Sequence, residues 1–129
     1  MSSAMDEKNP QRSDIDRFLF AEVDSIPHLE AILLVWKSRP KKWSADELSR
    51  SIYVPLDRAH AIIYDLGQRE IVTLEADGCS YNPEYRHNRM ISEVAEAYRR
   101  ELVRITNLIH SKASPAVREF ARAFRFKKD

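Results

Sequence analysis

The chain has 129 residues, of which 43% are hydrophobic and 32% charged, a composition typical of one globular domain. Its 21 basic and 20 acidic residues leave a formal net charge of +1, so the total charge indicates neither a polyanionic nor a polycationic partner. The single cysteine, Cys79, excludes a disulfide framework, and no apolar run approaches the roughly 20 residues of a membrane-spanning helix. Because the N-terminus is polar where a signal peptide would be apolar, and the thiol is unpaired, we expect a cytoplasmic protein.

The first predicted elements are a tail and two helices. Residues 1–13 have few apolar side chains and are expected to form a disordered tail. A short helix is indicated next by apolar residues at helical spacing, namely Ile15, Phe18, Leu19 and Val23. A second helix should begin after Ser25, a good N-cap, with Pro27 in its first turn. It should end at Lys37, because Pro40 disfavours helical geometry in the residue before it. Its apolar stripe consists of Leu29, Ile32, Leu33 and Trp36.

The clearest helix start lies at Ser44. Ser44 and Glu47 form a capping-box pattern, in which the serine hydroxyl accepts from the Glu47 amide while the glutamate reaches back to the Ser44 amide. The capped helix is short, with Leu48 and Ile52 as its buried contacts. A third helix is predicted over residues 55–69, with a buried stripe of Ala59, Ile62, Ile63 and Leu66.

A hairpin and long helices follow. Strands are predicted at residues 71–74 and 79–81, joined by a turn with Asp77-Gly78 at its tip. One continuous helix is then predicted over residues 84–109, because one apolar stripe is maintained by Ile91, Val94, Tyr98, Leu102, Ile105 and Ile109. A last helix is predicted over residues 115–126.

Helix, capped helix, turn, helix and hairpin, in that order over residues 29–81, resemble the winged helix-turn-helix domain of MarR-type regulators. The hydrophobic skeleton that carries the resemblance is Leu48, Ile52, Val54, Ala59, Ile62, Ile63, Leu66, Ile71 and Val72. The tail from Ile109 onward is similar to that of a group of small, uncharacterised bacterial winged-helix proteins. The resemblance implies a mainly α fold with a two-stranded β-hairpin and long C-terminal helices. It divides the chain into a tail (1–13), a winged helix-turn-helix domain (14–82) and a helical extension (83–129).

Two positions depart from the pattern of such domains. Tyr53 stands in the turn between the second and third helices, where many of them have glycine. Glu70 stands where a glycine usually ends the third helix. Neither change breaks the fold, and each suggests specialised contacts.

The resemblance implies a transcription regulator whose third helix lies in the DNA major groove. The exposed positions of that helix, with Asp65 among them, give the candidate DNA contacts Leu56, Asp57, Arg58, His60, Ala61 and Tyr64. Arg58 suits bidentate donation to a guanine. Lys41 and Lys42, in the loop before the capped helix, are candidates for phosphate contacts. Asp77 and Gly78 mark the wing.

The distribution of charge opposes DNA binding by this face. Residues 44–85 hold 3 basic against 8 acidic side chains, a net charge of −5, whereas residues 86–129 hold 11 against 5, a net charge of +6. DNA affinity depends on cations placed at phosphates, so the acidic segment favours an alternative. In that alternative, the module docks a basic protein partner on its acidic third-helix face and does not read DNA. The later arginines either support DNA binding or form a solvated face paired with Glu93, Glu96 and Glu101.

The apolar stripe of the helix predicted over residues 84–109 needs a partner. By resemblance, we expect a homodimer through the helices at 84–109 and 115–126. The alternative is that the first and last helices of the same chain cover the stripe. The segment Phe120–Phe126 alternates phenylalanine with basic residues, and we interpret it as a docked helix, with an acidic ligand or membrane surface as the alternative.

No catalytic, metal or cofactor pattern is evident. The four histidines, His28, His60, His87 and His110, lack ligand spacing, and 2 glycines could hardly build a phosphate loop. Cys79 is interpreted as a structural thiol, because a nearby Asp77 would raise its pKa. We therefore expect no enzyme activity, no cofactor, no metal and no membrane partner.

Overall fold

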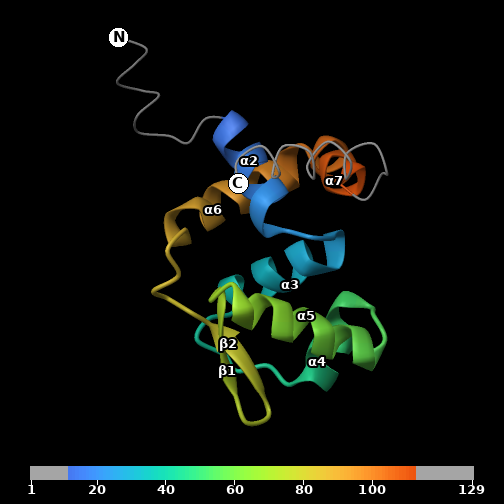
Figure 1. The fold of residues 1–129 in the computed structure, drawn as a ribbon, viewed down its shortest axis with the longest axis vertical. Helices are drawn as coiled ribbons and strands as arrows, with labels where there is room; N and C mark the ends of the chain where they lie inside the picture. Colours follow the sequence, from blue (N-terminus) through green and yellow to red (C-terminus); the bar gives the residue numbers. More distant parts are fainter. Residues whose placement is uncertain (1–11, 113–129) are drawn as a thin grey trace, which may run out of the picture. The chain divides into compact units, whose positions relative to one another are not determined.

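The computed structural model describes residues 12–112 (Figure 1). Its elements in chain order are α2 (Arg12–Glu22), α3 (Ile26–Lys37), α4 (Ala45–Ile52), α5 (Leu56–Gln68), β1 (Val72–Glu75), β2 (Gly78–Tyr81), α6 (Asn88–Arg100) and α7 (Leu102–Ser111). The fold is mainly α with a two-stranded antiparallel hairpin, as predicted. The predicted helix at 115–126 and most of the predicted tail at 1–13 lie outside the described residues, although α2 already begins at Arg12.

The chain divides into two compact units. One unit is Pro27–Ala95, which contains α4, α5, the hairpin and nearly all of α3. The other combines the described residues 12–26 with residues 96–112, and it contains α2 and α7. Among residues 12–112, none of the helices has the length and apolarity needed to span a membrane.

The core of the Pro27–Ala95 unit comes from the apolar faces of three helices and the start of the hairpin. Its buried side chains include Leu29, Ile32, Val35, Leu48, Ile52, Ala59, Ile62, Ile63, Leu66, Ile71 and Val72. The predicted stripes of α4 and α5 are therefore confirmed. On α3, Leu33 and Trp36 are only half-buried, while Ala31 and Val35 take the inner positions. The buried face of α3 is thus centred one position away from the predicted stripe.

The capping box at the start of α4 is confirmed. The Ser44 hydroxyl accepts from the Glu47 N–H, and the Ser44 N–H donates to Glu47 Oε1, with both separations 3.1 Å. Together these bonds satisfy two backbone donors at the helix start. They fix where α4 begins and hence where the next turn falls.

The two positions that lack the expected glycine both have left-handed backbone conformation. Tyr53 has φ 60° and ψ 50°, and Glu70 has φ 64°. Ser49 holds the first turn, since its carbonyl accepts from the Val54 N–H at 3.1 Å and its hydroxyl donates to the Val54 carbonyl at 2.6 Å. At the second turn, Asn82 Nδ2 donates to the Glu70 carbonyl at 2.8 Å. The chain therefore keeps a conformation that glycine favours without using glycine.

The hairpin joins β1 to β2 through the loop residues Ala76-Asp77. The predicted tip is wrong by one residue, because Gly78 already belongs to β2. Gly78 meets a different need: a Cβ built on it would lie 2.0 Å from the Trp43 carbonyl oxygen. Trp43 and Cys79 exchange two backbone hydrogen bonds, at 2.7 and 2.9 Å. The segment before α4 therefore runs directly beside β2.

The continuous helix predicted over residues 84–109 is wrong. α6 begins only at Asn88, and Glu101 separates it from α7 with φ −128° and ψ 50°. The Glu101 N–H still donates to the Ala97 carbonyl at 2.7 Å, and its own carbonyl accepts from the Ile105 N–H at 2.9 Å. The apolar periodicity crosses this interruption unchanged, so the sequence pattern could not reveal it.

In the second unit, α2 and α7 hold each other through apolar and charged contacts. The buried residues are Ile15, Phe18, Leu19, Val23, Ile105 and Ile109, which confirms the apolar pattern predicted for the first helix. Arg104 lies 2.9 Å from Asp16 and 2.6 Å from Glu101. Lys112 Nζ donates to the Val23 carbonyl, just past the end of α2. The two helices are thus joined at both their charged and their apolar surfaces.

Candidate nucleic-acid interface

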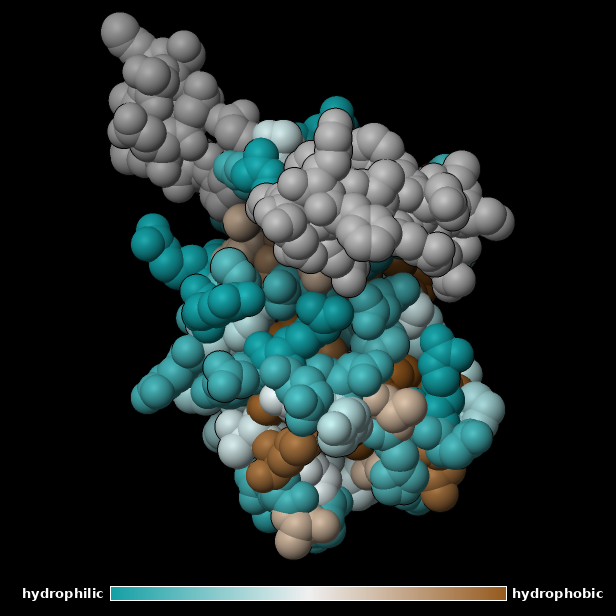
Figure 2. Space-filling model, viewed as in Figure 1, coloured by the Kyte–Doolittle hydropathy of each residue, from teal (hydrophilic) through white to brown (hydrophobic). Residues whose placement is uncertain are grey.

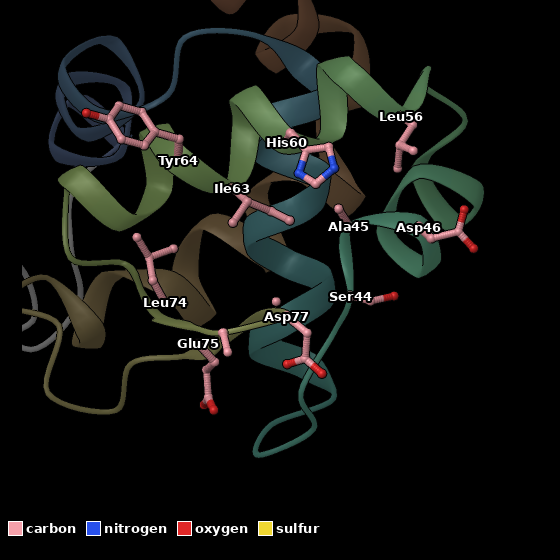
Figure 3. Close-up of a pocket in the computed structure, with 12 residues that line it drawn as sticks. Ser44, Ala45, Asp46, Leu56, His60, Ile63, Tyr64, Leu74, Glu75 and Asp77 are labelled. Atoms are coloured by element: carbon pink, nitrogen blue, oxygen red, sulfur yellow. The ribbon is translucent and has the colours of Figure 1, made fainter.

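The outer face of α5 carries the residues predicted to contact DNA. Leu56, Asp57, Arg58, His60, Ala61 and Tyr64 are all exposed, with Tyr64 at 60%. Figure 3 shows His60, Leu56 and Tyr64 projecting from this helix. Since the intervening positions of α5 are buried, the helical period separates a core face from a solvent face. The structure therefore brings the predicted α5 residues together on one surface.

Asp65 does not share this surface. It is half-buried, and its Oδ2 lies 3.1 Å from Nε2 of His28, a buried residue of α3. The prediction that Asp65 is an exposed position of this helix is corrected: the residue is only partly exposed and pairs with His28. The pattern gave no signal for the pair, because its two members are 37 residues apart in sequence. Asp65 attaches α5 to α3.

The start of α5 combines an acidic and a basic residue. The Asp57 carboxylate accepts from the Arg58 backbone N–H at 2.9 Å, which satisfies one of the unpaired donors at the helix N-terminus. A carboxylate there is stabilised by the positive end of the helix dipole. Asp57 therefore has a structural role in the first turn, while the side chain of Arg58 is exposed.

Lys41 and Lys42 are exposed before α4, as the phosphate-contact prediction requires, but each faces a carboxylate. Lys41 Nζ is 3.8 Å from Glu47 Oε2 and 4.6 Å from the ring centroid of Trp43. Lys42 Nζ is 3.2 Å from Glu75 Oε1. Exposed ion pairs contribute only about 0–1 kcal/mol, so a phosphate can compete for either lysine.

At the wing, the two predicted residues differ. Asp77 is exposed in the loop, whereas Gly78 is half-buried beside the Trp43 backbone. The wing loop therefore presents a carboxylate to a partner.

A hollow of about 450 Å³ lies between α5, the hairpin and the start of α4 (Figure 3). Its apolar lining includes Leu56, Ile63, Tyr64 and Leu74, and its carboxylates come from Asp46, Glu75 and Asp77. Leu74 lies against α5, where a Cβ on Gly67 would come within 2.7 Å of the leucine side chain. Neither the hollow nor the place of Leu74 in it was predicted from the sequence. The available signal was Leu74 itself, an apolar residue between the polar Thr73 and Glu75.

Cys79 lies on β2 with no exposed surface. Burial, together with the negative charge of Glu75, raises the pKa of its thiol from 9.0 to about 11. The thiol is therefore protonated at neutral pH and a poor nucleophile. The acidic residue that raises the pKa of the thiol is Glu75, and the prediction that Asp77 has this effect is wrong.

Comparison with known proteins agrees with this architecture. Neither a protein-family model nor a curated protein sequence matches the chain. Among solved structures, it is similar to the crystal structure of a MarR family protein from Mycobacterium tuberculosis, with a TM-score of 0.54 and 16% sequence identity. The match covers 92% of this chain and 85% of that one. The chain therefore has a winged-helix fold. Specifically, its fold resembles that of MarR-type proteins.

Proposed function

We propose that the chain is a winged-helix DNA-binding protein that regulates transcription. The observation that carries the proposal is the exposed face of α5, where all six predicted contact residues meet solvent. In helix-turn-helix proteins the corresponding helix lies in the major groove. There, the Arg58 guanidinium would donate to a guanine, and His60 and Tyr64 would bond base edges or phosphates.

Phosphate contacts would come from the segments on either side of α5. Lys41 and Lys42 precede α4, and the hairpin residues 73–81 follow α5. The ion pairs of the two lysines with Glu47 and Glu75 are at the surface and cost little to exchange. The lysines therefore supply two cations for phosphate contacts and reduce the net charge from −5 over residues 44–85 to −3 over residues 41–85.

We also propose a homodimer formed through the 84–109 and 115–126 segments, the second of which lies outside the described residues. Leu102 and Val103 at the start of α7 are 52% and 71% exposed, which supports an apolar contact there. A twofold dimer presents two α5 helices to two half-sites. A protein acting on chromosomal DNA would work in the cytoplasm, by binding and without catalysis.

An interaction module that docks a basic protein remains the second candidate. The observation that favours the interaction module is that the basic side chains around α4 are already in ion pairs. Lys41, Lys42 and Arg50 each face a carboxylate. Even with Lys41 and Lys42 counted, residues 41–85 hold 5 basic against 8 acidic side chains, so the segment keeps an acidic excess. Such a surface attracts a basic partner and repels phosphates.

The test is a mobility-shift titration of fragments of the source genome over a series of salt concentrations. DNA binding predicts an affinity that falls steeply with salt, and Arg58→Ala should weaken it by about 5- to 100-fold. Arg17→Ala is the matched control, since it removes one exposed charge from α2, outside the proposed DNA-contact and dimer segments, and should change affinity far less. A wild-type chain that fails to shift any fragment at low salt would contradict the proposal and leave the interaction module.

A further inference from the structure

We propose that the hollow between α5 and the hairpin is a docking site for a basic peptide segment of a partner protein, anchored by a large apolar side chain. The hollow has a volume of about 450 Å³ and belongs entirely to the Pro27–Ala95 unit. Its lining combines an apolar floor with a rim of carboxylates (Figure 3). That combination defines the chemistry of its occupant.

The apolar floor is formed by side chains that the fold leaves in water. Leu56 and Leu74 are each 47% exposed, and Tyr64 is 60% exposed. Within the Pro27–Ala95 unit, the exposed large hydrophobic residues are Tyr53 and these three, so three of four line one hollow. Figure 2 shows one side of the molecule, where apolar residues form separate exposed patches among hydrophilic residues. A gathered apolar patch with a polar rim is a mark of an interaction site.

The carboxylates at the rim of the hollow favour an occupant with a positive charge. Asp46 faces Arg50 and Glu75 faces Lys42, each in an exposed ion pair. In contrast, the Asp77 carboxylate makes no hydrogen bond or ion pair within residues 12–112. A lysine or arginine entering the hollow would therefore meet one carboxylate without a partner among residues 12–112 and two more nearby. An acidic occupant would be repelled by all three.

Apolar and cationic groups occur side by side in a peptide whose large apolar residue is flanked by arginine or lysine. DNA fits this hollow poorly, because its phosphates would face the carboxylates and its bases would not fill the apolar floor. The apolar side chain would rest between Leu56 and Leu74, and the flanking cation would reach Asp77. In protein interfaces, a buried anchor side chain is usually surrounded by a polar or charged rim.

Occupation of the hollow would also control the outer face of α5. Leu56, His60 and Tyr64 line the hollow and are also predicted DNA contacts. A bound peptide would therefore exclude DNA from α5. This regulatory part rests on the proposed DNA-binding function, whereas the docking site itself does not.

The first experiment selects peptides from a phage library of random 12-residue sequences on the full chain, without DNA. We expect a consensus with arginine or lysine beside a large aliphatic or aromatic residue. A synthetic peptide of that consensus, titrated onto the ¹⁵N-labelled chain, should shift the amide signals of Leu56, Leu74 and Ala76. Selection that yields no basic-apolar consensus, or amide shifts confined to other residues, would overturn the proposal.

Variants then test the contacts. Tyr64→Ser and Leu74→Ser should each weaken peptide binding about tenfold or more, as expected for truncated anchors. Asp77→Asn should weaken it several-fold and make it less sensitive to salt. Tyr53→Ser is the matched control, because Tyr53 is also an exposed large hydrophobic residue of this unit but does not line the hollow. Unfolding curves identify any variant that fails to fold, and unchanged affinity in folded Tyr64→Ser and Asp77→Asn would overturn the assignment.

Competition separates the two proposals. Where DNA binds, the peptide should displace it from the wild-type chain and not from Asp77→Asn at the same concentration. Peptide binding without any DNA binding would remove the proposed function and leave the docking site intact. Simultaneous binding of peptide and DNA would overturn the regulatory part alone.

Discussion

The two glycines and the two left-handed turns of the Pro27–Ala95 unit make an instructive contrast. Both glycines, Gly67 and Gly78, have ordinary backbone conformations, while the left-handed positions are occupied by Tyr53 and Glu70. Each glycine lies where another group approaches closely: the Leu74 side chain at one and the Trp43 carbonyl at the other. In this chain, glycine provides space at packed positions, and hydrogen bonds from neighbouring residues hold the strained turns.

The largest effect should follow from filling the space at Gly78. In Gly78→Ala, the new Cβ would start 2.0 Å from a backbone oxygen, which cannot rotate away as a side chain would. We expect a loss of at least about 2 kcal/mol in unfolding free energy, because the pairing of Trp43 with β2 must open. Urea denaturation followed by tryptophan fluorescence measures it. Ser80→Ala on the same strand is the control, and a loss below about 0.5 kcal/mol in Gly78→Ala would show that this space is not needed.

A smaller effect should follow from releasing the turn at Tyr53. In Ser49→Ala, the hydroxyl that donates to the Val54 carbonyl is lost, while the backbone bond between the two residues can remain. The expected loss is about 1 kcal/mol in unfolding free energy. Ser51→Ala is the control, because Ser51 is exposed on the same helix. Equal losses in the two variants would mean that helix α4, and not the turn, responds to the change.

Restoring glycine at the turn should stabilise the chain. A left-handed conformation costs a non-glycine residue about 1–2 kcal/mol. Glycine avoids this cost but loses more conformational entropy on folding, so only part of the strain energy is recovered as stability. We expect Tyr53→Gly to raise the unfolding free energy by about 0.5–1 kcal/mol. Little packing is lost, because the Tyr53 side chain is 91% exposed. Tyr53→Ala keeps the strain and should leave stability nearly unchanged, so a matching gain in that variant would refute the explanation.

Features encoded by neighbouring residues could be predicted from the sequence. The capping box depends on Ser44 and Glu47, three positions apart, and the structure has both of its hydrogen bonds. The stripe of α5 and the approximate position of each strand follow from local periodicity in the same way. Tyr53 and Glu70 could be located because many winged-helix domains have glycine at the corresponding positions, and the left-handed conformation of both residues agrees.

Features that depend on distant residues could not be predicted. The interruption at Glu101 leaves the apolar period intact, and the Glu101 carboxylate is held by hydrogen bonds from Arg104 and Arg12, 89 residues away, which also lower its pKa. The pairing of Asp65 with His28 depends on a helix far earlier in the chain, so the pattern of α5 could not indicate it. The hollow exists because tertiary packing brings Leu74 of β1 to α5. The sequence marks Leu74 as an apolar residue between polar ones, but it does not indicate the helix that Leu74 contacts.

The smallest effect on stability is expected at Gly67, and it sharpens the contrast with Gly78. In Gly67→Ala, the new Cβ would lie 2.7–2.8 Å from Cγ and both Cδ atoms of Leu74, and that side chain can move outward because the residue is 47% exposed. Alanine gains up to about 1 kcal/mol over glycine inside a helix, so the net change should lie within about 0.5 kcal/mol of zero. The displaced Leu74 should nevertheless alter the floor of the hollow, which amide shifts of residues 74–76 would detect. A loss above about 2 kcal/mol in unfolding free energy would mean that the Leu74 side chain cannot move. Glycine would then be required as strictly at position 67, beside a side chain, as at position 78, beside the backbone.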